Sequence, residues 1–465
     1  MSIENTFIKN SAGIGAVSNL ALTSQFPQRP GHGTQGKRIA VYANYFKLMV
    51  QSTLSLTRYN VEVNPLPPGR KLRRVLQLLF ERPEFTGVAT DFKTLIISPR
   101  PLDIPNPFQT TVIYRAEGDD DPSPNAATFA VRVVSPSPIP VSELLKYLSA
   151  TNPSPAFPGK EELLNALNAL LAFYPVAHDD VSNVGPKHFS VGGERPNSHN
   201  IRDIGGGIEA LRGFFQSVRP ATGGLLLNVN VTHGIFLRPE PLDKLFPLLG
   251  TGSKQTLQKK LRLVRVRVTH IAPKKSKRTG EEFPRIKTIL ALAQKEDGRK
   301  EPNPPQVSSF GAGPKNVKFW LGDDSSKKAD DKGQGKGKDK PKSSGPALPT
   351  NTYISVYDYF RASKSGYCHL NMWLTLVPEY PKIQLNENLP VLNVGTADRP
   401  SYLPAEVCVV LSGQVIKRRL SPAQTQVMIQ FACRKPWENG NSIVGDGKET
   451  LGLNPSSNPF LVSKV

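Results

Sequence analysis

A strict alternation of apolar and basic residues near the middle of the chain constrains its fold more than any other pattern. In Leu263–Val268, valines take every second position and arginines lie between them. Because successive side chains of a strand point to opposite faces, a strand here has Arg265 and Arg267 on one face and the valines on the other. The alternation therefore predicts a sheet with one cationic face.

Shorter runs upstream predict a sheet covered by helices. Lys37–Leu48 and Arg58–Val63 alternate apolar and polar residues, as half-buried strands do, and indicate an antiparallel sheet. Leucines and valine at 72–79 recur at helical spacing. The combination predicts an α+β region that begins near residue 36 and ends near 175.

Two further helices are predicted before that end. Ser142 is a candidate N-cap for a helix with Leu144, Leu145 and Leu148 on one face. Glu161–Phe173 carries leucines at helical spacing. Pro175 lacks an N–H and disfavours helix at the preceding residue, so Tyr174-Pro175 is expected to end this helix.

The middle and late parts of the chain contain turns, strands and an insertion. Gly205-Gly206-Gly207 lacks a following Gly-Lys-Ser/Thr, which favours a β-turn over a phosphate loop, and connecting strands are expected after it. Residues 322–345 mix Lys, Gly and Asp with almost no apolar side chain, which predicts a disordered insertion. Ser421-Pro422 is typical of a helix start.

Composition limits the classes of partner. Lys and Arg outnumber Asp and Glu by 59 to 38, a net charge of +21 that favours a polyanion, with nucleic acid ahead of an anionic membrane surface. No apolar run approaches the roughly 20 residues that span a bilayer. Three cysteines and no apparent secretory signal indicate a reducing compartment, cytosol or nucleus. We expect no cofactor and no metal site, because neither CxxC nor HExxH occurs.

Aromatic residues late in the chain suit a nucleic-acid end. Tyr359-Phe360 and Tyr402-Leu403 lie downstream of the basic stretch 254–287. Aromatic faces stack on an unpaired base of any identity, while Lys and Arg hold the phosphates. Each of these residues also has an ordinary interpretation, since a continuous strand puts Tyr359 and Phe360 on opposite faces and one of them in the core.

Several ordered segments resemble the N-terminal half of a eukaryotic Argonaute, with fungal features. The segments are Gly36–Phe46, Phe214–Pro220 followed by Gly224–Val231, Thr269-His270, Tyr359-Phe360, Leu389–Gly395, Tyr402–Cys408 and Ser412–Gln414. The resemblance implies a multidomain α+β chain in which β-rich linkers join the N domain to an OB-like β-barrel PAZ domain with an inserted hairpin. The implied division is 1–35 flexible tail, 36–175 N domain, 176–239 linker 1, 240–412 PAZ domain and 413–465 start of linker 2.

What the resemblance implies about function is anchoring of the 3′ end of a small guide RNA by PAZ and handling of the guide–target duplex by the N domain. The residues it implies for the RNA 3′ end are Tyr359, Phe360, Tyr402, Leu403, His270 and Phe319. For phosphates, sequence and resemblance together indicate Arg265, Arg267, Lys274, Lys275, Lys277, Arg278, Arg361 and Lys364. The phosphate-binding cation cannot be assigned uniquely among Lys275, Lys277 and Arg278, because the sequence around these residues departs from the family pattern.

We expect a monomer. We also expect it to bind RNA without cutting it, because in the family the PIWI domain, which cleaves RNA, and the MID domain follow this region. If the chain is a fragment, the MID–PIWI half would be its partner. The expected location is the cytoplasm, with the nucleus as alternative. Two other functions stay open: a basic scaffold that recruits acidic proteins without preference for an RNA end, and a degenerate nuclease with its own active site.

Overall fold

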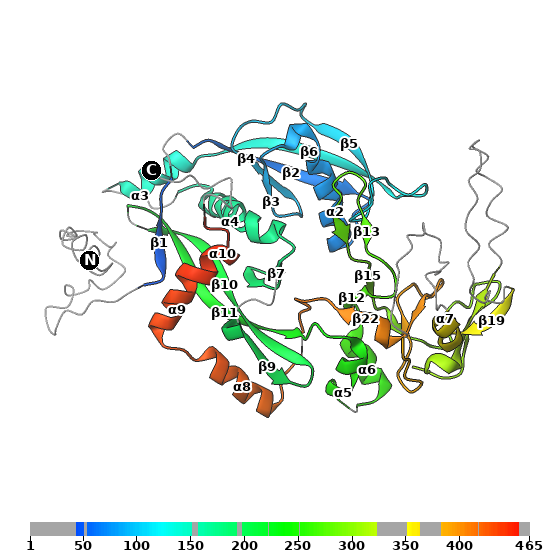
Figure 1. The fold of residues 1–465 in the computed structure, drawn as a ribbon. Coiled ribbons are helices and arrows are strands. Elements are labelled where there is room, and N and C mark those ends of the chain that lie inside the picture. The colour runs from blue at the N-terminus through cyan, green and yellow to red at the C-terminus, as the bar shows by residue number, and fades with distance from the viewer. Residues whose placement is uncertain are drawn as a thin grey trace, which may run out of the picture. The chain divides into compact units, whose positions relative to one another are not determined.

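The computed structural model describes residues 43–50, 54–150, 157–192, 198–221, 223–250, 252–322, 351–362, 383–416 and 418–454. The described residues form a multidomain α+β arrangement of several sheets with helices between them (Figure 1). The expected tail at 1–35 and insertion at 322–345 lie outside the described residues, apart from Gly322.

An antiparallel five-stranded sheet and one helix build the first core, which we call the N-terminal core. The sheet order is β3-β4-β2-β6-β5. Its strands are β2 (Leu56–Asn64), β3 (Ala89–Thr90), β4 (Leu95–Ser98), β5 (Phe108–Ile113) and β6 (Thr128–Ile139). Helix α2 (Gly69–Phe80) buries Leu72, Val75, Leu76 and Leu79 against it. The predicted helix on a sheet is confirmed.

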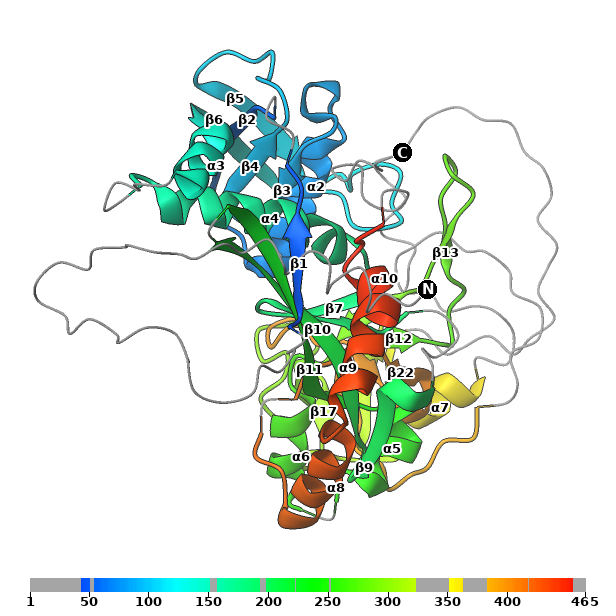
Figure 2. The same cartoon turned by 90° about the vertical axis from the view of Figure 1, so that its left-hand side faces the viewer.

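A long hairpin organises the second sheet (Figures 1 and 2). Its order is β1-β11-β10-β8-β7, with β9 also paired to β10. The strands are β1 (Tyr45–Leu48), β7 (Val181–Val184), β8 (Lys187–Ser190), β9 (Ile201–Gly205), β10 (Ile208–Ala221) and β11 (Gly224–Leu237). Gly205, which ends β9, and Gly206 and Gly207, which precede β10, all have positive φ, from +65° to +81°, so they form the expected turn.

One pairing differs from the sequence expectation. The two alternating N-terminal runs were expected in one antiparallel sheet, yet Tyr45–Leu48 pairs with Leu225–Asn228 of β11, whereas Arg58 lies in the other sheet. Alternation fixes which face of a strand is buried and leaves its partner open. The part of the first run before residue 43 lies outside the described residues.

Helix α4 (Lys160–Ala177) continues through Pro175, so the expected stop at Tyr174-Pro175 is wrong. A proline at this position cannot donate to the carbonyl four residues earlier, which belongs to Leu171. The Nε2 of Gln216, on β10, donates to that carbonyl oxygen at 3.2 Å, and Gln216 is 7% exposed. The strand therefore replaces the hydrogen bond that proline removes, and the helix runs on for two residues.

The predicted N-cap of α3 (Val141–Ser149), Ser142, was also wrong. The capping position is Pro140, and Ser142 lies inside the first turn. Val141 and Leu144 are buried in a second core, the middle core, which joins α3 and α4 to strands β10 and β11. The helix therefore begins at Val141, one residue before the side chain that was expected to cap it.

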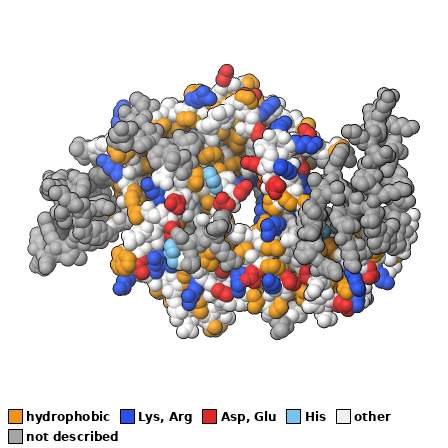
Figure 3. Space-filling view, viewed as in Figure 1, with side chains coloured by type: hydrophobic (Ala, Val, Ile, Leu, Met, Phe, Trp, Pro, Cys, Tyr) orange, Lys and Arg blue, Asp and Glu red, His pale blue; other side chains and the backbone are white. Residues whose placement is uncertain are grey.

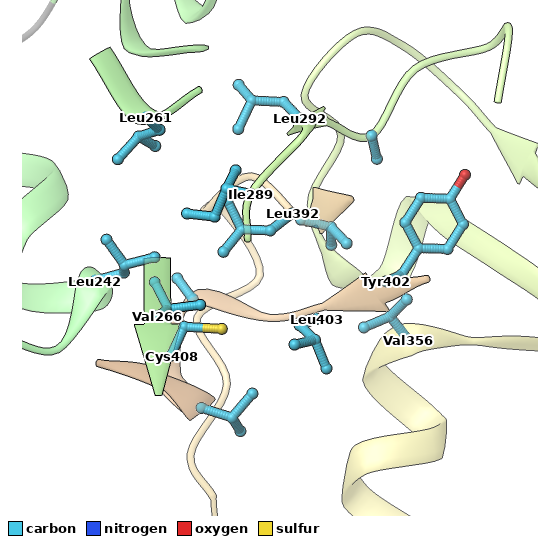
Figure 4. Close-up of a cluster of buried hydrophobic side chains, with 14 of the residues drawn as sticks. Leu242, Leu261, Val266, Ile289, Leu292, Val356, Leu392, Tyr402, Leu403 and Cys408 are labelled. Atoms are coloured by element: carbon cyan, nitrogen blue, oxygen red, sulfur yellow. The ribbon is translucent and has the colours of Figure 1, made fainter. Parts of the chain in front are cut away.

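Short sheets and helices surround the third and largest core, which we call the large core (Figure 4). Its helices are α5 (Leu242–Leu248), α6 (Lys254–Leu261) and α7 (Val356–Ala362). The strands nearby are β12 (Arg265–Val268), β13 (Lys274–Lys275), β14 (Glu282–Phe283), β15 (Ile286–Thr288), β16 (Ala291–Leu292), β17 (Gln306–Val307), β18 (Val317–Leu321), β19 (Thr352–Ser355), β20 (Leu392–Asn393), β21 (Tyr402–Leu403) and β22 (Cys408–Val410).

These strands form the sheets β15-β12-β22, β16-β20-β21 and β17-β18-β19 and the hairpin β13-β14. Within the described ranges they are not hydrogen-bonded into one closed barrel. The multidomain α+β class is confirmed, whereas the expected OB-like barrel is present as separate small sheets around a shared interior.

The last described helices are α8 (Pro422–Ala432), α9 (Pro436–Ser442) and α10 (Lys448–Thr450). The predicted cap of α8 is confirmed: the Ser421 hydroxyl accepts from the Gln424 N–H at 3.3 Å, and the Gln424 side chain accepts from the Ser421 N–H at 3.1 Å. None of the helices that the structure describes combines the length and the apolar character needed to cross a bilayer.

Candidate nucleic-acid interface

Tyr359 and Phe360 lie on helix α7, not on the continuous strand from which opposite faces were expected. The helix starts because Ser355 caps it: its hydroxyl accepts from the Asp358 N–H at 3.0 Å and donates to the Asp358 carboxylate at 2.6 Å. On a helix, adjacent residues diverge by about 100° rather than 180°. Both rings can therefore enter the same core.

Four of the predicted RNA-end residues form a continuous row of edge-to-face rings. The ring centroids of Phe319 and Tyr359 are 5.3 Å apart, those of Tyr359 and Phe360 5.4 Å, and those of Phe360 and His270 5.0 Å. The interplanar angles lie between 71° and 76°, the T-shaped geometry that aromatic pairs favour. We call Phe319, Tyr359, Phe360 and His270 the ring row.

The two middle members of the ring row are buried and the two ends are half-buried. Tyr359 is 4% exposed and Phe360 is 7% exposed, so other protein atoms cover most of each side chain. Phe319 and His270 retain partial exposure. A ligand that reaches the row without rearranging the core meets Phe319 or His270 first.

His270 is uncharged at neutral pH. Burial, with Lys287 as a smaller cause, lowers its pKa to about 4. Its Nδ1 is buried and has no hydrogen-bond partner among the described residues. The imidazole therefore offers a ring face and an unpaired polar atom rather than a positive charge.

Tyr402 and Leu403 lie on β21 and belong to the same large core, at 8% and 4% exposed. The Tyr402 ring lies at the margin of the cluster, with its hydroxyl directed away from the aliphatic side chains (Figure 4). That hydroxyl donates to Oδ2 of Asp297 at 3.0 Å. Burial and the nearby carboxyl raise the pKa of Tyr402, and burial raises that of Asp297.

Asp297 was not identified from the sequence, because nothing local links it to a tyrosine 105 residues away. Its carboxylate also accepts from the Gln294 N–H at 3.2 Å. Because its hydroxyl is hydrogen-bonded to Asp297, Tyr402 packs at the edge of the large core in this conformation. It is not part of the ring row that the described contacts define.

The predicted cationic strand is confirmed. Val266 and Val268 are 0% and 4% exposed on β12, while Arg267 is exposed and Arg265 half-buried. The strand pairs with β15 on one side and β22 on the other. It begins at Arg265 rather than at Leu263, which has φ +67° and is 63% exposed. The alternation thus places the two arginine side chains on the face opposite the large core.

The basic residues of the hairpin β13–β14 have unexpected partners in the N-terminal region. The Lys274 ammonium pairs with the Asp119 carboxylate. The Ser276 hydroxyl donates to Oδ1 of Asp120 at 2.7 Å, and the Lys277 N–H donates to Oδ2 at 2.6 Å. Lys275, Lys277 and Arg278 have exposed side chains. Asp119 and Asp120 were not identified from the sequence, because no local pattern links Asp120 to Ser276, 156 residues away.

Arg361 follows Phe360 on α7 and is exposed, with its guanidinium 5.9 Å from the centre of the Tyr357 ring. The Lys315 ammonium lies 4.9 Å from the same ring. Lys364, the last of the predicted phosphate-binding residues, lies outside the described residues.

Charges of both signs are interspersed on the face of the molecule shown in Figure 3. The net charge of +21 is therefore not displayed there as one continuous basic surface. No group of three or more His, Cys, Asp or Glu within the described ranges could hold a metal ion.

Two family models match the chain. Residues 37–171 match the N-terminal domain of argonaute, and residues 187–238 match the Argonaute linker 1 domain. The chain is 24% identical over 437 residues to protein argonaute 1D of Oryza sativa subsp. japonica, a match that covers 90% of this chain and 34% of that protein. It is also 24% identical over 437 residues to protein argonaute 5 of Arabidopsis thaliana, covering 90% and 36%.

A solved structure agrees with these matches at the level of fold. The structure of Kluyveromyces polysporus Argonaute with a guide RNA aligns with a TM-score of 0.50 and 13% identity, over 92% of this chain and 44% of that one. The chain spans about a third of the length of the curated relatives it matches.

Proposed function

The chain belongs to the eukaryotic argonaute proteins, whose N-terminal and linker 1 domains it carries, and on that premise we propose that it is the RNA-binding half of an RNA-guided silencing protein. In this proposal the large core acts as a PAZ module that anchors the 3′ end of a small guide RNA. The N-terminal core handles the guide–target duplex.

The observation that carries the proposal is the ring row. Phe319 and His270 retain exposed surface at the two ends of a row whose middle is fixed by packing. An aromatic ring held in a fixed position suits stacking on a terminal base, which needs an unpaired π-face and no sequence-specific hydrogen bond.

Cations on nearby elements support the same proposal. Arg267 is exposed on β12, two residues before Thr269-His270, and Arg361 is exposed on α7 next to Phe360. Phosphates following the terminal nucleotide would be neutralised by such side chains, which supply most of the affinity of proteins for nucleic acids.

The proposal includes RNA binding without cleavage, a monomeric chain, a cytoplasmic location and, if the chain is a fragment, the remaining MID–PIWI half as partner. Binding without cleavage is checked by incubating the purified chain with labelled RNA and Mg²⁺. Cleavage that depends on the metal would support the degenerate nuclease instead.

The decisive experiment is a titration of the 465-residue chain with three RNA duplexes that differ only in their ends: a two-nucleotide 3′ overhang, a blunt end and a 5′ overhang. The proposal expects the tightest binding to the 3′ overhang. Equal affinity for all three would favour the basic scaffold, which has no preference for an RNA end.

A variant pair on one strand assigns the site. The Phe319 ring packs against the Tyr359 ring, whereas the ring of the adjacent Trp320 packs against Tyr353, with the two ring centroids 5.2 Å apart. Because neighbours on a strand face opposite sides, Phe319→Ala removes the stacking ring and Trp320→Ala is its matched control. We expect Phe319→Ala to lose the overhang preference, worth about 1–3 kcal/mol for one stacked base. Trp320→Ala should keep it.

A further inference from the structure

The turn at the tip of hairpin β13–β14 holds a carboxylate with several converging donors. The Ser276 hydroxyl and the Lys277 N–H each donate to a different oxygen of Asp120, at 2.7 and 2.6 Å. The Ser276 hydroxyl oxygen also accepts from the Arg278 and Thr279 N–H groups, at 3.2 and 3.1 Å. Ser276 is 7% exposed. The turn is therefore ordered around the anion that it binds.

The acidic loop that supplies this anion is itself anchored. The Arg115 guanidinium donates to the Asp120 carbonyl oxygen at 2.7 Å and to both oxygens of the Glu81 carboxylate, at 2.8 and 2.6 Å. Gly118 has φ +73°, and a Cβ there would lie 2.7 Å from the Phe283 side chain. The loop and the hairpin thus meet through a close backbone approach as well as through charge.

A hydroxyl, a backbone N–H and neighbouring lysines are also the donors that bind phosphate groups. Three cations of the hairpin, Lys275, Lys277 and Arg278, keep exposed side chains around the turn. Asp119 on Lys274 and Asp120 on the turn together present two negative charges on adjacent residues. Successive phosphates of an RNA strand present the same charge to such a surface.

We propose that the turn Ser276–Thr279 is a binding site for RNA phosphodiesters, and that the loop carrying Asp119 and Asp120 occupies it as an intramolecular competitor. RNA binds the hairpin when the acidic loop leaves it. This inference rests on the proposed RNA-binding function and adds a regulatory contact between the N-terminal region and the hairpin.

The competing carboxylate of Asp120 carries its negative charge when it occupies the turn. The Lys277 N–H and the Ser276 hydroxyl hold the pKa of Asp120 below its usual range, so the carboxylate is charged at neutral pH. A charged competitor reduces the apparent affinity for RNA in proportion to the fraction of molecules in which it occupies the turn. The acidic loop therefore lowers the affinity of the turn for RNA without abolishing binding.

The test is a double substitution with a charge-matched control. Asp119→Asn with Asp120→Asn removes the competing charges, and Asp103→Asn with Asp121→Asn changes the net charge equally at two exposed aspartates. Among the residues that the structure describes, neither control residue forms a hydrogen bond or an ion pair. Affinity of the full chain for a 3′-overhang RNA duplex is measured at several salt concentrations.

We expect the Asp119/Asp120 variant to bind RNA at least about fivefold more tightly than the control variant, in the range typical of coupling between sites. The salt dependence of its binding should steepen, because the released hairpin contacts additional phosphates. Weaker binding than the control would overturn the proposal, since the loop would then hold the hairpin in its RNA-binding position. Equal binding would also overturn it.

A second probe separates this inference from the proposed function. Inorganic polyphosphate offers phosphates with no base and no 3′ end. Tighter polyphosphate binding by the Asp119/Asp120 variant, together with equal affinity for overhang and blunt RNA, would support the phosphate site and reject the RNA-end function. Ser276→Ala combined with the two asparagines should abolish the gain for both probes; a gain that persists would place the phosphates elsewhere and reject the turn.

Discussion

The ring row and the hairpin turn are two candidate RNA-contacting regions of one chain, and different interactions hold them in place. Tyr359 and Phe360 are fixed by burial in the large core. The turn at Ser276 is held by hydrogen bonds and charge to a loop 156 residues away in sequence.

The difference teaches which contacts can be exchanged. Apolar burial has no equivalent partner in water, so a ring removed from the core leaves a cavity. Charged and polar donors can replace one anion by another at a small net change in free energy. The ring row is therefore suited to a fixed surface, and the turn to a contact that opens.

The strongest way to break the comparison is to truncate a buried ring. Phe360→Ala should lower the free energy of unfolding by about 3–5 kcal/mol, because a buried phenyl ring is lost and a cavity remains. Urea unfolding followed by circular dichroism measures the change. Arg361→Ala, at the exposed neighbouring position, should stay within about 0.5 kcal/mol. A small loss for Phe360→Ala would mean that the ring lies on a surface.

A pH titration of stability tests the buried end of the ring row. The pKa of His270 is about 4 in the folded chain, below its ordinary value of 6.5. Between these values the unfolded chain binds a proton that the folded chain does not, so stability is complete above pH 6.5 and is lost as pH falls toward 4.

His270→Gln should remove its share of that loss, roughly 3 kcal/mol between pH 7 and pH 4. The measurement is urea unfolding of both proteins across that range. His188 and His233, whose pKa values are also lowered to about 4 by burial, leave a residual slope in the variant. An unchanged slope would show that His270 is solvated.

At the hairpin the expected cost of a deletion is smaller. Ser276→Ala removes the hydroxyl that bonds Asp120 and accepts from the Arg278 and Thr279 N–H groups, which should cost about 1 kcal/mol. Thermal unfolding measures it. A cost as large as that of Phe360→Ala would contradict the distinction between a packed and an exchangeable region.

The smallest effect on stability, and a clear effect on RNA binding, is expected at the cationic strand. Arg267→Gln should leave unfolding within about 0.5 kcal/mol and reduce the slope of log affinity against log salt by about 1, as for one lost phosphate contact. Arg299→Gln, at an exposed arginine paired with Glu296, makes the same charge change. Equal slopes for the two variants would exclude Arg267 from the interface.

Local patterns in the sequence predicted local structure well. The Val/Arg alternation placed Val266 and Val268 inside and Arg267 outside, and the Ser421 cap begins α8 as expected. Each depends on neighbouring residues alone. The aromatic residues also meet in one core, although the helix that carries Tyr359 and Phe360 was not expected, because its Val-Tyr start resembles a strand and its Ser355–Asp358 cap is a short signal.

Contacts between distant residues could not be predicted in the same way. The partner of Tyr402 is Asp297, and that of Ser276 is Asp120, each more than a hundred residues away. The mistaken stop at Pro175 has the same origin, since the donor that rescues the Leu171 carbonyl comes from β10. Proline rules describe an isolated helix and omit what a neighbouring strand can supply.

The Leu171 carbonyl couples the stability of α4 to that of β10. The final turn of α4 lacks one backbone hydrogen bond because of Pro175, and the Gln216 side-chain amide of β10 donates to the Leu171 carbonyl in its place. Fraying of β10 would therefore destabilise the C-terminal end of α4, and both segments should exchange their amide hydrogens with solvent as one cooperative unit. The linker thus acts as part of the helix that it follows in sequence.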